Sequence, residues 1–343
     1  MDDGVKKWLS YHLANHTSVY GNEMDDFLGK NVATIINHLQ LDNLIDKFFF
    51  IRYAEAGPHI RLRLHSDVAS EAVIYDTIRL NGQKYFAKIL KSNLSEKITT
   101  QLPKQFQVTF FEDQSINKIE YIKETDRFGG IDAIKIVEDE FCNSSKFALE
   151  IFATNQNISR TQKLWISYLM LNYFLTVVFQ EEYEEWVIFL VNYSRAALDA
   201  EMGDIAAKLW EDGAGLYQYM RNYNKNAMPK FVACMYSHFN KRYEYFSDVI
   251  NKKTQTIFES TNKMPIYMSK WHDNLYVNLT ALKKLASTDK IKLHTFTDIT
   301  AKQKFIAIIA SILHLHNNRL GLSLIDEAWI SFSLAKWLNT NKV

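Results

Sequence analysis

Two arginines stand two residues apart in a short alternating segment, residues 60–65. The segment reads Ile-Arg-Leu-Arg-Leu-His, so apolar and charged residues alternate strictly. This alternation predicts a β-strand with the apolar side chains on one face and Arg61, Arg63 and His65 on the other. Two guanidiniums spaced in this way lie roughly 6.7 Å apart and repel each other unless solvent or an anion is nearby. Because each can bind a carboxylate through two hydrogen bonds, the pattern fits a carboxylate clamp. It also fits the solvated face of an ordinary amphipathic sheet.

A third arginine, Arg127, precedes the glycine pair Gly129 and Gly130. Glycine adopts backbone angles that other residues avoid, so this pair allows the chain to pass close to a ligand. Glu124, three residues before Arg127, is placed to pair with it. The segment is therefore either a wall of a ligand site or a plain turn with a local ion pair.

Two histidines lie on a helix predicted over residues 302–317. At about 100° per residue, His316 falls on the apolar stripe, which predicts a buried core histidine. His314 points almost the opposite way, toward small and polar residues that suit a cavity wall. Asn318 follows one turn later and is placed to orient the His314 ring. His314 is thus a candidate proton carrier, with a surface or supporting role as the alternative. The two side chains diverge too far to share a metal ion.

The elements that must position these groups change in type along the chain. The first part mixes strands and helices, with predicted helix 27–44, strand 48–53, turn 54–59, and strands 60–65, 106–111 and 119–122. The later part predicts helices over 132–141, 160–179, 184–198, 233–249, 302–317 and 326–338, with a connector at 261–266. We therefore expect an α+β protein: an amino-terminal mixed β-sheet with helices (1–145), then a mainly α-helical lobe with the histidine motif (146–343). The two lobes are expected to form one integrated catalytic unit.

The composition excludes several classes of protein. The chain has 343 residues, of which 47% are apolar and 23% are charged, as in globular proteins. Only 11 glycines and 4 prolines interrupt it, which favours long helices with short connections. The net charge of +1 gives no overall attraction to nucleic acid or anionic lipid. Nucleotide-binding, zinc-protease and serine-hydrolase motifs are absent.

The sequence also carries signals about location. Cys142 and Cys234 lack the spacing of a zinc site and fit a reducing cytosol. The acidic start does not resemble a signal peptide. The longest apolar stretch, 164–179, is too short for a membrane span and contains polar residues. We therefore expect a cytoplasmic protein without a membrane span.

Five segments together resemble the glutamate-elimination domain of lantibiotic dehydratases, a family that includes stand-alone thiopeptide-type bacteriocin biosynthesis proteins. They read WLSYH (8–12), FFIRY (49–53), PHIRLR (58–63), ETDRFGG (124–130) and HLHNNRL (314–320). The resemblance spans nearly the whole chain, and its strand and helix motifs are specific in combination. Phe128 departs from the family pattern, which usually has tyrosine there.

The resemblance implies a reaction shared between two proteins. A partner that uses glutamyl-tRNA attaches glutamate to a serine or threonine hydroxyl of a ribosomal precursor peptide. The elimination domain removes the α proton and expels the glutamate carboxylate, which leaves dehydroalanine or dehydrobutyrine. The glutamylating region of full-length dehydratases is not recognisable in this sequence, so we expect the stand-alone elimination component of a split dehydratase. Its expected partners are the precursor peptide, the glutamylating protein and a second copy in a homodimer.

The resemblance also implies roles for individual residues. Arg61, Arg63 and Arg127 are expected to stabilise negative charge on the leaving glutamate and on the enolate-like oxygen. His314 is expected to move the proton, because histidine titrates near the working pH. The implied substrate-binding residues are His59, Glu124, Asn318 and Arg319. No metal or other cofactor is implied.

Two other functions stay open. Thiopeptide pyridine synthases resemble the same scaffold, but they join two dehydroalanines in a formal 4+2 cycloaddition and expel the leader peptide. The retained arginines and His314 favour elimination over this reaction. A non-catalytic peptide-binding subunit would instead use an exposed sheet edge to take up a leader peptide.

Overall fold

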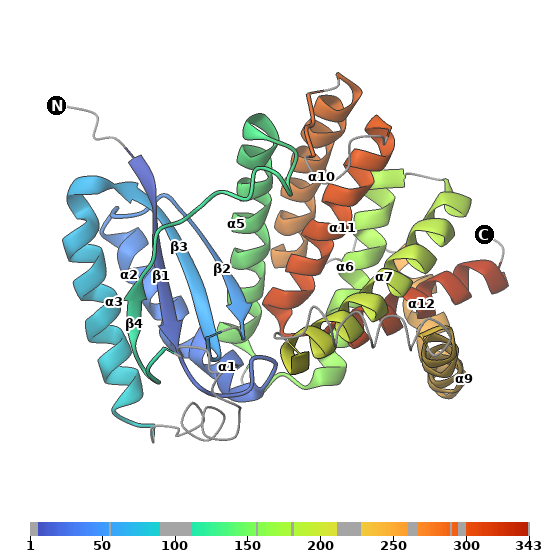
Figure 1. Ribbon diagram of the computed structural model, residues 1–343, viewed down its shortest axis with the longest axis horizontal. Helices are drawn as coiled ribbons and strands as arrows, with labels where there is room; N and C mark the ends of the chain where they lie inside the picture. Colours follow the sequence, from blue (N-terminus) through green and yellow to red (C-terminus); the bar gives the residue numbers. More distant parts are fainter. Residues whose placement is uncertain are drawn as a thin grey trace. The chain divides into compact units, whose positions relative to one another are not determined.

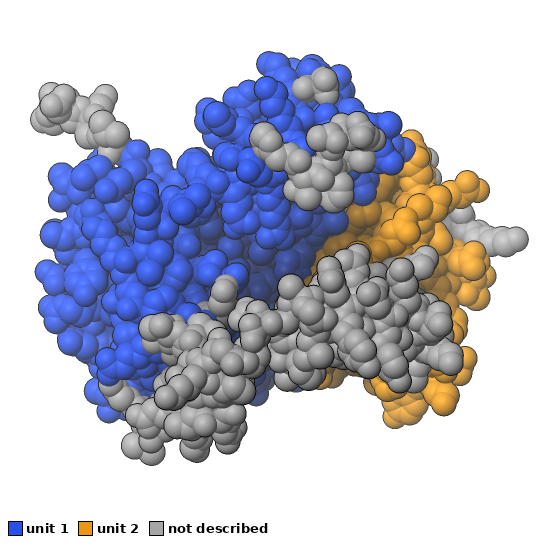
Figure 2. All heavy atoms as spheres, viewed as in Figure 1, with its two compact units in different colours: residues 1–102, 107–159, 266–321 blue, residues 103–106, 160–265, 322–343 orange. Residues whose placement is uncertain are grey.

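The computed structural model of the protein describes residues 6–54, 56–89, 111–155, 157–179, 182–210, 228–259, 266–288, 290–293 and 300–341. It divides into two compact units, which Figure 2 shows in different colours. Unit 1 comprises residues 1–102, 107–159 and 266–321, and unit 2 comprises 103–106, 160–265 and 322–343. The units are discontinuous in sequence, whereas the division expected near residue 145 is continuous. One long helix, α5 (Ile131–Thr154), passes through that position without a break.

Unit 1 contains an antiparallel sheet in the order β2-β3-β1-β4. Its strands are β1 (Lys6–Ala14), β2 (Lys47–Tyr53), β3 (His59–Asp67) and β4 (Ile116–Lys118). The predicted strands 48–53 and 60–65 are confirmed as the β2–β3 hairpin. The predicted strand 119–122 is wrong: β4 ends at Lys118, and the chain then leaves the sheet. The predicted strand 106–111 lies outside the described residues except for Phe111, which is irregular.

Helices cover both faces of this sheet, as Figure 1 shows. On one face lie α1 (Asn22–Asp26), the π-helical turn η1 (Phe27–Val32), α2 (Ala33–Leu41) and, after the short turn η2 (Val68–Ser70), α3 (Glu71–Phe86). On the other face lies α5. The predicted helix 27–44 therefore corresponds to the continuous run from α1 to α2. Helix α3 was not predicted, because its sequence is rich in polar residues and has only a weak apolar stripe.

The alternation in β3 sorts its side chains between these two layers. Tyr11, which pairs with Leu62, contacts Tyr75 of α3, so the apolar face of β3 packs on the α1–α3 layer. Phe49, which pairs with Arg63, contacts Phe141 of α5. The arginine face of the strand is therefore directed toward α5 and not toward open solvent.

Two further helices complete unit 1: α10 (Ile266–Ser287) and α11 (Ala301–Leu320). Helix α11 begins with a capping box in which the Thr300 side chain accepts from the Gln303 backbone and the Gln303 side chain accepts in return. This confirms the helix predicted over 302–317. Helix α10 was not predicted, and the connector expected at 261–266 falls outside the described residues except for Ile266.

Unit 2 consists of helices in its described part. They are α6 (Arg160–Phe179), α7 (Tyr183–Trp210), α9 (Met228–Glu259) and α12 (Leu324–Asn341), each of which contains a predicted helix. Buried Ser194 donates to the Ala328 carbonyl at 2.8 Å and joins α7 to α12. None of the helices in the described residues of either unit is long and apolar enough to cross a bilayer.

Candidate functional site

A cavity of about 520 Å³ opens on the arginine face of the sheet, entirely within unit 1. Six of the predicted site residues line it: Arg61, Arg63, Glu124, Arg127, His314 and Asn318. They come from β3, from the loop before α5 and from α11, segments that are far apart in sequence. Two predicted residues, His59 and Arg319, are not among its lining residues.

Arg63 is almost completely enclosed, at 8% exposure. Its guanidinium lies 5.3 Å from the centre of the Tyr121 ring. Its hydrogen bonds are long, 3.5 Å to the Leu62 carbonyl and 3.4 Å to Nε2 of His12. Burial, with a further contribution from neighbouring Arg61, lowers the pKa of Arg63 to about 10. The charged form of this side chain is therefore poorly compensated in the folded protein.

Arg61 is half-buried and lies flat on Tyr53, with its guanidinium carbon 3.3 Å from the ring centre. Its Nε donates to Nε2 of His59 at 3.4 Å. Among the residues that the structure describes, neither Arg61 nor Arg63 forms an ion pair with a carboxylate. Two neighbouring guanidiniums thus face the cavity, and no carboxylate of the described residues forms an ion pair with either.

Arg52, in the same sheet, is an arginine whose charge is compensated by the protein itself. It is 1% exposed, and its guanidinium donates to Oδ1 of Asp25 at 2.7 Å and to the carbonyls of Val19 and Arg319 at 3.0 and 3.1 Å. Every nitrogen of that guanidinium has a close acceptor, one of them a carboxylate. Arg63, by contrast, has only long hydrogen bonds and no carboxylate partner among the described residues.

Two stacked histidines lie against the arginine pair and contact it. The rings of His12 and His59 lie 4.8 Å apart and nearly parallel. His59 is 1% exposed, its Nδ1 lies 2.7 Å from the Gly57 carbonyl, and its Nε2 is thereby left to accept from Arg61. His59 therefore acts on Arg61 and not directly on the contents of the cavity.

His12 lines the cavity and was not singled out from the sequence. Burial first, and then the charges of Arg63, His59 and Arg61, lower its pKa to about 3. It is therefore neutral at physiological pH and a weak base. The register places it opposite Arg61, a pairing that no local signal predicts because β1 and β3 are about fifty residues apart in sequence.

Arg127 and Glu124 form the expected local ion pair, with 3.3 Å between Nη1 and Oε2, and both line the cavity. Gly129 and Gly130 follow with φ of 88° and 94°, in the region that favours glycine, and Gly130 caps the amino terminus of α5. The local ion pair is therefore present and lines a cavity, and a role of this segment in binding a ligand stays a prediction. Phe128 is fully buried and does not present its ring to solvent.

Helix α11 contributes His314, which is partly exposed at the cavity. Asn318 has a different partner from the one expected. Its Oδ1 accepts from the Arg52 backbone N–H at 2.9 Å, and its Nδ2 donates to the Arg52 carbonyl at 3.0 Å. The amide thus fixes α11 to the edge strand β2 and is not engaged in orienting the His314 ring.

The other two residues of the histidine motif are internal. His316 is 1% exposed and lies 3.1 Å from Oε1 of Glu140, which confirms a buried core histidine. Arg319 is fully buried and donates to Ser145 Oγ at 3.0 Å and to the Leu315 carbonyl at 2.9 Å. The structure therefore places Arg319 between α11 and α5, and it is not among the residues that line the cavity.

A second residue that sequence reasoning missed is Tyr121. It belongs to the crossing segment (residues 119–123), which leaves β4 and passes over the arginine face of the sheet. Its hydroxyl donates to Glu138 at 3.0 Å; burial first, and then this carboxylate, raise the pKa of Tyr121. The same carboxylate accepts from Trp8 Nε1 at 3.0 Å and pairs with Lys123 at 3.0 Å. Glu138 therefore holds the crossing segment against Arg63.

The described residues contain no group of three or more histidine, cysteine, aspartate or glutamate side chains suited to hold a metal ion. The polar lining of the cavity instead consists largely of cations, together with the imidazoles of His12 and His314 and the carboxylates of Glu120 and Glu124. Such a set is suited to binding an anionic group and to moving a proton beside it.

Solved structures with a similar fold cover nearly the whole chain. They are the pyridine synthase TbtD from thiomuracin biosynthesis (TM-score 0.63, 13% identity, 96% of this chain and 97% of that chain) and TsrL (TM-score 0.59, 15% identity, 99% and 96%). A third is the tRNA-dependent lantibiotic dehydratase MibB from Microbispora sp. 107891 (TM-score 0.53, 14% identity, 100% of this chain but 29% of MibB). At these identities the likeness concerns the fold.

The sequence itself carries the family assignment. Epidermin biosynthesis protein EpiB of Staphylococcus epidermidis is 27% identical over 158 residues, which make up 46% of this chain and 13% of EpiB. The match thus spans a small part of the length of that relative. Residues 8–338 match the family described as lantibiotic biosynthesis dehydratase C-term. Because the match covers nearly the whole chain, the protein belongs to the lantibiotic biosynthesis dehydratase C-terminal family.

Proposed function

We propose that the protein eliminates glutamate from glutamylated serine or threonine residues of a ribosomal precursor peptide. The observation that carries this proposal is the pair Arg61 and Arg63, which face the cavity without a carboxylate partner among the described residues. A glutamyl ester brings a carboxylate, and its departure creates a second one. Both are anions for which guanidiniums supply matching pairs of donors.

The reaction needs a proton carrier beside this anion site. A base takes the α proton of the esterified residue, the C–H electron pair becomes the π bond between Cα and Cβ, and the bond between Cβ and the ester oxygen breaks, with its electron pair staying on that oxygen. Glutamate departs as a carboxylate, so no oxidant or reductant is required. His314 is the imidazole suited to this task, because His12 is held neutral with a pKa near 3 and binds protons weakly.

The arginines contribute to the rate by stabilising the charge that develops. Arg63 is enclosed by protein, so its electrostatic interactions are screened less than those at an exposed surface. Arg127 is placed in the same cavity on the loop before α5 and supplies a third cation, with Glu124 keeping it in place. The cavity volume of about 520 Å³ is in the range of ordinary ligand sites and suits one modified side chain with its backbone.

This function requires a partner that loads the substrate. A glutamylating protein that uses glutamyl-tRNA supplies the glutamylated precursor peptide, which places both proteins in the cytoplasm. MibB is a tRNA-dependent lantibiotic dehydratase, and this chain resembles 29% of that protein. The expected homodimer stays a prediction.

The direct test is to incubate the protein with a chemically glutamylated precursor peptide and to follow the peptide mass. We expect loss of one glutamic acid per modified site. The unmodified peptide is the control for substrate, and the Arg63→Lys variant is the control for the clamp. An intact glutamylated peptide after incubation with the folded wild-type protein would contradict the proposal.

A second candidate is pyridine synthesis, which the fold of TbtD over 96% of this chain supports. That reaction needs shape and hydrogen bonds more than it needs a cluster of guanidiniums, so the cavity favours elimination. A precursor peptide that already contains two dehydroalanines separates the two functions. Formation of a ring with release of the leader peptide would identify the synthase.

A further inference from the structure

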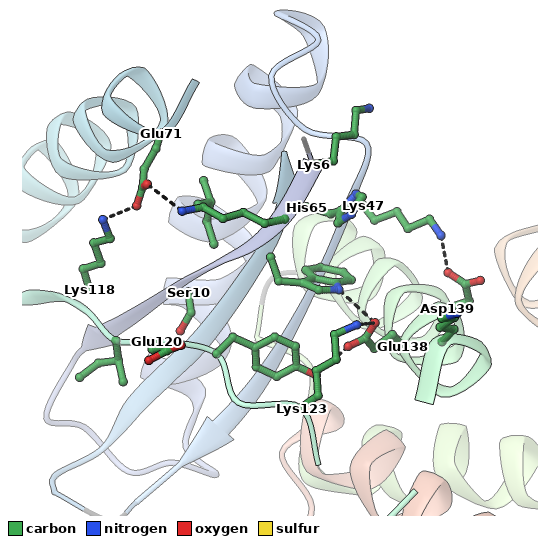
Figure 3. A pocket seen from close by; sticks show the side chains of 16 residues that line it. Lys6, Ser10, Lys47, His65, Glu71, Lys118, Glu120, Lys123, Glu138 and Asp139 are labelled. Atoms are coloured by element: carbon green, nitrogen blue, oxygen red, sulfur yellow. Dashed lines mark hydrogen bonds and ion pairs between the residues drawn. The ribbon is translucent and has the colours of Figure 1, made fainter. Parts of the chain in front are cut away.

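A second and larger cavity, of about 910 Å³, lies in unit 1 beside the first (Figure 3). Five consecutive residues of β1, from Lys6 to Ser10, line it. Successive side chains of a strand point to opposite faces of a sheet, so consecutive residues share one cavity only where it runs along the edge of the strand. Leu9 and Ser10 are 3% and 4% exposed, which fits lining through the main chain. We call this cavity the edge groove.

The main chain of β1 is open along this groove. Strand β4 pairs with β1 only between Tyr11 and Leu13, and the crossing segment then turns away after Ile119 donates to the Ser10 carbonyl at 3.2 Å. Ala14 also bonds toward β4, through both its N–H and its carbonyl. Even-numbered residues of β1 therefore direct their main-chain groups to this edge, which includes Lys6 and Trp8. Among the described residues no strand pairs with them there.

The charges around the edge groove are mostly positive. Its lining holds six lysines and four carboxylates, an excess of two positive charges. Several of the charges neutralise each other: Glu71 pairs with both Lys7 and Lys118, Lys47 pairs with Asp139 at 2.6 Å, and Lys123 pairs with Glu138 at 3.0 Å. Lys6 pairs at 3.2 Å with Asp46, which lies outside the lining, so the excess is one positive charge once Asp46 is counted. Lys135 is exposed and makes no ion pair with a described residue. An incoming strand with carboxylate side chains suits this groove better than a basic one.

The two cavities share lining residues, so one extended peptide can occupy both. Ile119, Glu120, Tyr121 and Lys123 of the crossing segment line both of them. Trp8 lies in the edge groove and His12 in the arginine cavity, and four residues of strand span roughly 13 Å. A peptide with its reacting residue in the arginine cavity therefore has a segment about four residues away that reaches the open edge.

We infer that the edge groove binds an extended, acidic segment of the peptide substrate, which adds to β1 as a further strand. This inference rests on the proposed function, because it assumes that the substrate is a peptide. Main-chain bonds to Lys6 and Trp8 supply affinity that depends little on sequence, and the lysines supply the preference for carboxylates. The β1 edge of a second copy is a poor occupant, since pairing of the two edges would place Lys6 and Lys7 of one copy beside the same lysines of the other, and like charges repel.

The probe is a fluorescein-labelled decapeptide of alternating glutamate and valine, and the readout is fluorescence anisotropy with the full chain. We expect binding that weakens with added salt. A lysine–valine decapeptide and a glutamate–valine decapeptide with N-methylated amides should each bind at least about tenfold more weakly. Equal binding of the N-methylated peptide would overturn strand addition, and equal binding of the lysine peptide would overturn the charge preference.

Variants of the groove test the same inference from the side of the protein. Lys6→Pro removes a main-chain donor that faces the open edge, at the first position of the strand, where proline is tolerated. It should bind the acidic probe several-fold more weakly than Lys6→Ala, which removes the same charge. Lys135→Glu should also weaken binding, whereas Lys84→Glu, an exposed position outside both cavities, should not. Melting temperatures check that each variant is folded.

The outcome can be separated from that of the proposed function. Arg63→Lys should lose elimination and still bind the probe. If the wild-type protein binds the probe by these criteria but leaves a glutamylated peptide intact, the groove stands and the proposed function fails. If it eliminates glutamate while Lys6→Pro and Lys135→Glu bind and process peptides like the wild type, the groove inference fails. Loss of a dimer in Lys6→Pro would assign the edge to a second copy and overturn it as well.

Discussion

Replacing Arg63 with methionine should stabilise the protein while it abolishes elimination. The structure gives the reason: the folded state lowers the pKa of this guanidinium from 12.5 to about 10, chiefly by burial. At about 1.36 kcal/mol per pKa unit, the charged form costs the folded state about 3 kcal/mol. The contact with the Tyr121 ring, 5.3 Å away, returns about 1 kcal/mol of that. Arg63→Met should therefore raise the free energy of unfolding by about 2 kcal/mol.

The destabilisation that the charged Arg63 side chain causes depends on pH. Below pH 10 the guanidinium is charged in both the folded and the unfolded protein, so the penalty is present in full. It disappears only as the pH rises through about 10 toward 12.5, where the folded protein loses the proton first. The stability difference between Arg63→Met and the wild type should therefore be the same at about pH 6 and at about pH 9.

The assay is urea unfolding of both proteins, followed by tryptophan fluorescence. Arg52→Met is the matched control, because Arg52 is also buried in the same sheet and burial lowers its pKa as well, but it pairs with Asp25. Removing it deprives a buried carboxylate of its cation and should lower the stability by about 3–5 kcal/mol. If Arg63→Met is less stable than the wild type, the arginine is a structural group and the reasoning that assigns it to an anionic ligand is refuted.

Three other predictions concern the reaction. Arg61→Lys and Arg63→Lys should each leave the glutamylated peptide to accumulate, because an ammonium group cannot bind a carboxylate through two parallel hydrogen bonds as a guanidinium does. Near-normal elimination rates by mass spectrometry would contradict the carboxylate clamp. His314→Ala should lower kcat by at least about a hundredfold with a smaller change in KM, whereas His316→Ala should lower the melting temperature. A fully active His314 variant beside an inactive, well-folded His316 variant would identify His316 as the proton carrier. Chelators should leave elimination unchanged, and activity that is lost with a chelator and restored by one metal would contradict a metal-free mechanism.

The parts of the site that sequence reasoning placed correctly are those with local geometry. The shared face of Arg61 and Arg63 follows from period-two alternation alone, and the Arg127–Glu124 pair follows from spacing along a single turn. The burial of His316 follows from the helical period of α11. Each of these depends on a few neighbouring residues, whose geometry the chain itself fixes.

The parts that were missed depend on contacts between distant segments. His12 meets the arginines because β1 inserts beside β3, and Tyr121 covers Arg63 because the chain leaves β4 after three residues. In place of the strand expected at 119–122, the chain forms this crossing, in which Glu138 binds Tyr121, Trp8 and Lys123 at once. Asn318 was assigned to His314 from helical spacing, yet the backbone of an edge strand competes for its amide and binds both ends.

The same crossing explains why one sheet can carry both an enclosed cation pair and an open edge. A β4 strand long enough to pair with all of β1 would satisfy the main chain of Lys6 and Trp8, but it would not bring Tyr121 over the sheet. By ending at Lys118, the strand frees the chain to cover Arg63, and the amino-terminal half of β1 then has no strand partner on that side among the described residues. The enclosure that lowers the pKa of Arg63 and the edge offered to a peptide thus have one structural origin. A variant that loosens the crossing segment, such as Glu138→Ala, should therefore raise the pKa of Arg63 toward its ordinary value; an unchanged pKa would show that this segment does not enclose the guanidinium.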